Sequence, residues 1–199
     1  MELYGDRILG RLVKWGIRLL RRTDMDRCAN FCAWAARTFG PMTKAQRIGR
    51  DNLRHAFPDK DAAWIERTLR ESWDNLGRVV GEYVHMARIW DYDPDRPNTG
   101  RIRTDAIGLF EQLRDDGQPA LCFSAHLGNW ELPAIAAAAH GLPSAVVYRM
   151  PNNKAVAREI TRIRAPLMGR LIRTRAQAAI EMASALENGD HLGMLTDQH

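Results

Sequence analysis

The second half of the chain alternates short apolar runs with helical patterns, and this alternation limits the folds open to it. Three runs have the length and turn-bounded character of buried strands: PALCFS at 119–124, SAVVYR at 144–149 and HLGMLT at 191–196. Helical patterns are found at 104–116, 130–140, 153–167 and 177–187. Strands separated by helices are typical of a mainly parallel sheet with right-handed crossovers, so we expect an α/β fold.

The first half of the chain is predicted to form a helical region that precedes this sheet. Candidate helices cover residues 5–21, 25–39, 43–56 and 60–88. The last of them has the clearest pattern, and Asp59 or Asp61 can cap its start. Its apolar stripe consists of Ile65, Leu69, Trp73, Leu76, Val80 and either Tyr83 or Val84.

Positive charge is concentrated near the N-terminus. Residues 1–50 hold 11 basic and 4 acidic side chains, a net charge of +7, whereas residues 51–199 carry −2. Two neighbouring stripes at helical spacing, one apolar and one basic, are formed by Ile8, Leu12, Trp15 and Leu19 and by Arg7, Arg11, Lys14 and Arg18. Such a helix suits an anionic membrane surface, although it could also pack on the chain's own core. The charged residues leave no apolar run long enough for a membrane span, and they also argue against a cleavable signal peptide.

Composition argues against several other classes. The six tryptophans are scattered and no nucleic-acid-binding motif is present, so we expect no nucleic-acid partner. The three cysteines and six histidines follow no zinc-site spacing, and no phosphate-binding glycine loop occurs, so neither a metal nor a cofactor is expected.

A candidate catalytic histidine follows the first predicted strand. His126 and Glu131 form an H-x4-E motif across a turn made by Gly128 and Asn129. With six histidines the spacing alone arises readily by chance, but α/β enzymes place their chemistry at such strand-to-helix turns. Glu131 could accept a hydrogen bond from one imidazole nitrogen and leave the other as a base. Ser124 is a weaker candidate nucleophile, so direct attack by a substrate hydroxyl on an activated acyl carbon is the natural scheme. Turn amides or an arginine would then stabilise the oxyanion.

Three ordered blocks around this motif, FSAHLGNWE, VVYRMPNN and GMLTDQ, resemble the lipid A late acyltransferases, the lauroyl and myristoyl transferases of lipopolysaccharide synthesis. RIGRDNLRHAFPD and WDNLGRVVGEYVHM are similar to the helical region upstream of the site in that family. The resemblance implies a glycerolipid-acyltransferase-like fold on the cytoplasmic face of the bacterial inner membrane. It also implies transfer of a fatty acyl chain from acyl carrier protein to a hydroxyl of a phosphorylated lipid A precursor, with no covalent acyl-enzyme.

The resemblance also assigns roles to individual residues. His126 is implied as the general base and Glu131 as its partner. Arg149 is expected to bind a phosphate or stabilise the oxyanion. Further substrate-binding candidates are Asn129, Arg164, Asp197 and Gln198. Asn152 and Asn153, in the same block as Arg149, are equally suited to forming a turn.

The domains follow from the same comparison. We expect residues 1–40 to form basic amphipathic, membrane-associating helices and residues 41–199 to form the acyltransferase domain, which lacks the C-terminal third usual in the family. Two alternatives remain: an acyltransferase acting on glycerolipids or lysophospholipids, and a catalytically inactive membrane-binding fragment. A basic cluster could be a solvated face or could dock the acceptor's phosphates or acidic acyl carrier protein; it comprises Arg158, Arg162, Arg164, Arg170, Arg173 and Arg175.

Overall fold

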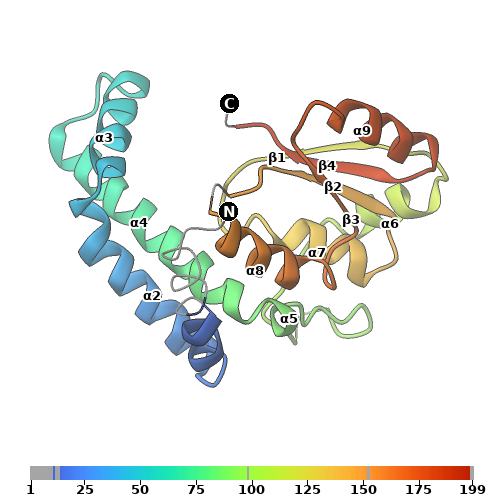
Figure 1. Cartoon of the computed structure of the whole chain (residues 1–199), viewed down its shortest axis with the longest axis horizontal. Helices are drawn as coiled ribbons and strands as arrows, with labels where there is room; N and C mark the ends of the chain where they lie inside the picture. The colour runs from blue at the N-terminus through green and yellow to red at the C-terminus, as the bar shows by residue number, and fades with distance from the viewer. Residues whose placement is uncertain (1–10, 12–13, 98, 152, 198–199) are drawn as a thin grey trace. The chain divides into compact units, whose positions relative to one another are not determined.

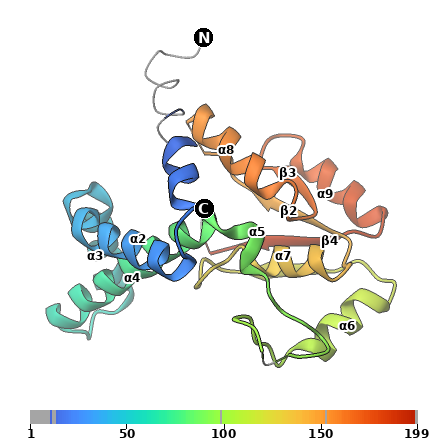
Figure 2. The same ribbon diagram turned by 90° about the horizontal axis from the view of Figure 1, so that it is seen from below.

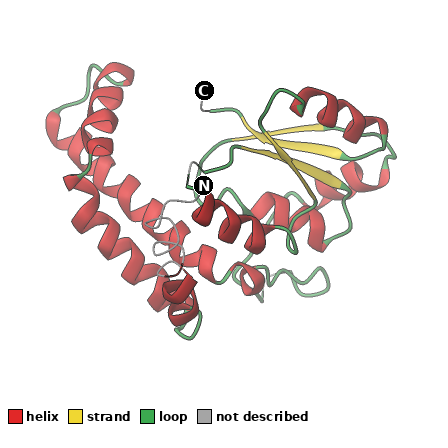
Figure 3. Ribbon diagram, in the orientation of Figure 1, coloured by secondary structure: helices red, strands yellow, loops and turns green. Residues whose placement is uncertain are grey.

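The computed structural model describes residues 11, 14–97, 99–151 and 153–197. The chain divides into two compact units, a helical unit of Trp15–His85 and a sheet unit that includes Met86–His199 (Figures 1 and 3). A helical N-terminal region followed by a parallel sheet with flanking helices confirms the predicted fold class. Within the described part of the chain, no helix combines the length and the apolar character needed to cross a membrane.

The helical unit contains the helices expected from the sequence. Residues 14–20 are helical, while most of the predicted N-terminal amphipathic helix lies outside the described residues. The elements that follow are α2 (Met25–Phe39), the short 3-10 helix η1 (Gly40–Met42), α3 (Lys44–Ala56) and α4 (Ala62–Val84). Asp61 caps α4 as predicted, because its side chain accepts a hydrogen bond of 2.7 Å from the amide of Trp64.

Helices α2 and α4 pack closely through small residues. A Cβ atom added to Gly77 would lie 2.5 Å from the Cα of Ala33, and one added to Gly81 would lie 2.6 Å from the Cα of Ala29. The two glycines are four residues apart, as are the two alanines, so each helix presents one row of small residues to the other. The apolar stripe predicted for α4 is only partly buried. Ile65 and Leu69 are buried, whereas Leu76 and Val80 are exposed.

The sheet unit contains a four-stranded parallel sheet with strand order β1-β4-β2-β3. Its strands are β1 (Leu121–Ser124), β2 (Ser144–Tyr148), β3 (Arg170–Arg173) and β4 (His191–Leu195). Its helices are α5 (Met86–Ile89), α6 (Ile107–Asp115), α7 (Leu132–Ala139), α8 (Lys154–Arg164) and α9 (Ala178–Glu187). Strand β3 was not expected from the sequence, whereas the other three strands were.

The strand order determines which face each helix covers. The connections from β1 to β2 and from β2 to β3 run in one direction across the sheet, and the connection from β3 to β4 runs back. Right-handed crossovers then place α7 and α8 on one face and α9 on the other, as Figures 1 and 2 show. The core beneath α9 is formed by Ala145, Ile172, Ala185 and Leu192.

The predicted functional boundary at residue 40 falls inside the helical unit, between α2 and α3. The division into two compact units therefore neither supports nor contradicts this boundary, and a membrane-associating role for residues 1–40 stays a prediction.

Candidate active site

The strand register brings His126 and Asp197 together. Strand β4 pairs in parallel with β1, with Ser124 opposite Leu195. His126 and Asp197 each follow their register partner by two residues, so they lie opposite each other at the carboxyl edge of the sheet. This is the edge at which open α/β sheets bind their ligands.

His126 and Asp197 are joined by two hydrogen bonds. The backbone amide of His126 donates to Oδ2 of Asp197 at 3.0 Å, and Nδ1 of His126 lies 2.9 Å from Oδ1. These contacts, first the amide and then the imidazole, lower the pKa of the Asp197 carboxyl from its ordinary value. An ionised Asp197 accepts a hydrogen bond from the protonated Nδ1 and leaves Nε2 of the ring as the basic nitrogen. The His126 side chain remains 30% exposed, so a substrate can reach it.

Trp130 supports the same imidazole. Its ring centroid lies 4.9 Å from that of His126, with the rings tilted by 60°. We had not singled out Trp130 from the sequence, although it stands within the FSAHLGNWE block. The aromatic contact and Asp197 together fix the plane in which the imidazole lies.

The turn after β1 begins helix α7. Gly128 has a φ of +52°, a left-handed conformation that favours glycine. Oδ1 of Asn129 accepts a hydrogen bond of 3.2 Å from the amide of Glu131, the residue that caps α7. Asn129 therefore shapes the turn that carries His126.

Glu131 makes a different contact from the one expected. It is 5% exposed, and its carboxylate accepts hydrogen bonds from Nε of Arg164, at 3.0 Å, and from Nη2 of the same side chain. The guanidinium of Arg164 also lies 5.7 Å from the centroid of the Tyr148 ring. Among the described residues the hydrogen-bond partner of the His126 ring is Asp197, not Glu131. Tyr148 belongs to the VVYRMPNN block, but no role was predicted for it.

The remaining candidates are distributed around this edge. Arg149 is exposed and directly follows β2, the strand on the other side of β4 from β1. Ser124 is exposed at the end of β1, and Gln198 lies outside the described residues. In the basic cluster, Arg162 pairs with Glu159 and Arg175 with Glu181. Arg170 and Arg173 are the first and last residues of β3, and both are exposed.

Comparison with known protein families shows the class of protein to which the chain belongs. Residues 2–199 match the family described as bacterial lipid A biosynthesis acyltransferases. The chain belongs to this family. No curated protein matches it. The chain is thus an acyltransferase, as the resemblance had implied.

The acyltransferase carries its candidate base on a rigid scaffold. His126 follows one strand, Asp197 follows the neighbouring strand, and Glu131 and Arg164 tie the start of α7 to the end of α8. A base held in this way can take a proton from a hydroxyl without first reorganising, and general-base catalysis of this kind contributes about 10²–10⁴-fold to a rate.

Proposed function

We propose that this acyltransferase moves a fatty acyl chain from acyl carrier protein to a hydroxyl of a phosphorylated lipid A precursor, with His126 as the general base. The observation that carries the proposal is the hydrogen bond between Nδ1 of His126 and Asp197 at the open edge of the sheet. It leaves Nε2 for the substrate, as a base requires.

The proton balance of the reaction needs only this histidine. Nε2 takes the proton of the acceptor hydroxyl as its oxygen attacks the carbonyl carbon of the thioester. The tetrahedral intermediate collapses, the carbon–sulfur bond breaks, and the imidazolium returns the proton to the departing thiolate. Asp197 stays ionised throughout and stabilises the imidazolium. No covalent acyl-enzyme is formed.

Arginines suit the charges of both substrates. Arg149, at the end of β2, is our candidate for stabilising the oxyanion or holding a phosphate of the acceptor. Arg164 is held by Glu131 and serves to position α7, the helix that follows His126. The exposed Arg170 and Arg173 are suited to the acidic surface of acyl carrier protein.

The substrates imply a location on the cytoplasmic face of the bacterial inner membrane. The net charge of +7 over residues 1–50 supports attachment to an anionic membrane surface.

Mass spectrometry of lipid A tests the proposal in a bacterial host that lacks its own copy of the enzyme. We expect the gene to restore one acyl chain and the His126→Ala variant to restore none. His55→Ala is the matched control: His55 is an exposed histidine on α3, so this variant should restore the acyl chain as the wild type does. Full restoration by His126→Ala would exclude the mechanism.

The same experiment separates the alternative acceptors. If lipid A stays unchanged while the phospholipids gain an acyl chain, the acceptor is a glycerolipid. If neither lipid class changes although the protein is present at the membrane, the chain is a catalytically inactive membrane-binding protein.

A further inference from the structure

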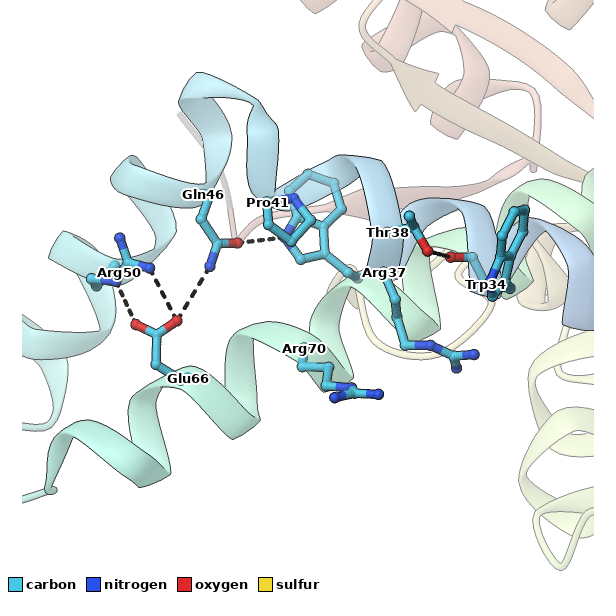
Figure 4. A pocket seen from close by; sticks show the side chains of 9 residues that line it. Trp34, Arg37, Thr38, Pro41, Gln46, Arg50, Glu66 and Arg70 are labelled. Carbon is cyan, nitrogen blue, oxygen red and sulfur yellow. Dashed lines mark hydrogen bonds and ion pairs between the residues drawn. The ribbon is translucent and has the colours of Figure 1, made fainter.

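The helical unit contains a hollow of about 600 Å³ that the proposed transfer reaction does not use. Helices α2, α3 and α4 and the η1 turn enclose it (Figure 4). Its lining is basic and aromatic and consists of Trp34, Arg37, Thr38, Pro41, Gln46, Arg50, Glu66, Arg70 and Trp73. Three arginines thus face one carboxylate, so an anion is the favoured ligand.

One wall of the hollow is fixed by a chain of hydrogen bonds. The indole nitrogen of Trp73 donates to Oε1 of Gln46 at 2.6 Å, and the amide nitrogen of Gln46 donates to Glu66 at 3.4 Å. Glu66 also receives Nε and Nη2 of Arg50, at 2.5 and 3.0 Å. Gln46 is 9% exposed, so this wall is already ordered before a ligand arrives.

Arg70 is the cation in the hollow that is available to a ligand. Glu66, Arg70 and Asp74 follow each other at intervals of four residues on α4, so the arginine has a carboxylate one turn away on each side. Both carboxylates are already engaged, Glu66 with Arg50 and Asp74 with Arg37 and Arg78. Among the described residues none forms a hydrogen bond or ion pair with Arg70. In Figure 4 the side chains of Arg37 and Arg70 extend away from Glu66.

Exposed aromatic residues lie beside these arginines. The ring of Trp34, a lining residue that is 51% exposed, has its centroid 5.8 Å from that of Phe31 and 6.3 Å from that of Phe39. Phe31 and Phe39 are more than half exposed as well. Aromatic rings next to arginines suit the boundary between the headgroups and the acyl chains of a bilayer.

We propose that this hollow binds the phosphate of an anionic phospholipid. Arg70 holds the phosphate oxygens, while Trp34 and its aromatic neighbours contact the glycerol and upper acyl region. The exposed rings favour a lipid over free phosphate, because a small anion has no apolar part that the rings could contact.

Binding to vesicles tests the site with the full chain and two charge-conserving variants. The vesicles are phosphatidylcholine with and without phosphatidylglycerol, and binding is followed by co-sedimentation. Arg70→Lys keeps the charge but loses the bidentate geometry, so we expect about three- to tenfold weaker binding to the anionic vesicles. Arg67→Lys is the matched control: Arg67 is exposed on the same helix outside the hollow, and we expect its variant to bind like the wild type.

Two results would overturn the proposal. Equal binding by both variants would mean that general surface charge, not the hollow, attracts the vesicles. The second result combines two measurements. If inorganic phosphate saturates a site, as followed by tryptophan fluorescence, and this binding depends on Arg70 whereas vesicle binding does not, the ligand is free phosphate. Thermal unfolding of each variant checks that the fold is intact. No acyl donor is present, so the outcome is independent of the proposed transfer reaction.

Discussion

Two carboxylates lie near His126, the proposed general base, and their surroundings differ. Asp197 is partly exposed and touches the His126 ring, whereas Glu131 is buried and holds Arg164. A partly exposed carboxylate on an imidazole affects chemistry more than folding. A buried carboxylate on a guanidinium affects folding first, because its loss removes the carboxylate partner of a partly buried cation.

Asp197→Asn and Glu131→Gln should therefore fail in different ways. We expect Asp197→Asn to lower kcat by about 10²–10⁴-fold with little change in stability, because an amide can stabilise the wrong imidazole tautomer. Glu131→Gln should lower the free energy of unfolding by about 3 kcal/mol. Kinetics and denaturant unfolding of both variants measure the two effects. A Glu131→Gln variant that is inactive but has normal stability would instead indicate that Glu131 acts on His126 during catalysis.

The pH dependence of Asp197 offers a second check at this scale. Its pKa is lowered, so the stability it adds is present above the ordinary pKa of an aspartate and is lost as the pH falls through the lowered value. We expect NMR titration to show that the pKa of the Asp197 carboxyl lies below its ordinary value. In His126→Ala its pKa should rise only in part, since the backbone amide at position 126 still donates. An unchanged pKa in that variant would contradict the contact with the ring.

Sequence reasoning identified His126 and the turn around it but not its hydrogen-bond partner. Glu131 was the natural choice because it is five residues away along the chain. Asp197 is 71 residues away and reaches His126 only because β4 inserts beside β1, a strand order that local patterns do not specify.

At the scale of single elements, the contact between α2 and α4 depends on residues without bulk. Gly77→Ala would force a methyl group to within 2.5 Å of the backbone of α2, and overpacking of this kind costs about 1–3 kcal/mol. We expect chemical denaturation to show that loss in the helical unit. Gly16→Ala is the matched control, because no described residue outside its own helix has an atom within 4 Å of the added atom and alanine favours a helix. A Gly77→Ala variant as stable as wild type would mean that the two helices can separate easily.

Strand β3 and the buried face of α4 were not predicted correctly, because neither is marked by an apolar pattern. Strand β3 has the sequence Arg170–Arg173, with an arginine at each end, so its two apolar residues were interpreted as part of a basic cluster. In α4 the apolar stripe included Leu76 and Val80, but both are exposed. The face toward α2 uses Gly77 and Gly81 instead, and hydrophobicity patterns do not register contacts made by glycine.

Across the whole molecule, net charge is distributed unevenly along the chain. Of the net charge of +5, residues 1–50 contribute +7 and the remainder −2. The long-range attraction to an anionic membrane should therefore come mainly from residues 1–50, because each basic residue near such a surface contributes about 1 kcal/mol. The rest of the chain should contribute through local contacts, such as the one proposed at Arg70.

Salt should weaken this attraction, since the Debye length falls from about 30 Å to about 10 Å between about 0.01 and 0.1 M salt. We expect affinity for phosphatidylglycerol vesicles to fall over that range, and Arg18→Gln to weaken binding and flatten its dependence on salt. Arg103→Gln lowers the net charge equally but lies in the sheet unit, and it should bind like the wild type. Equal losses in both variants would show that the membrane senses only the total charge. A loss confined to Arg18→Gln would show that position along the chain matters, because screened charges act only on what lies within a Debye length of them.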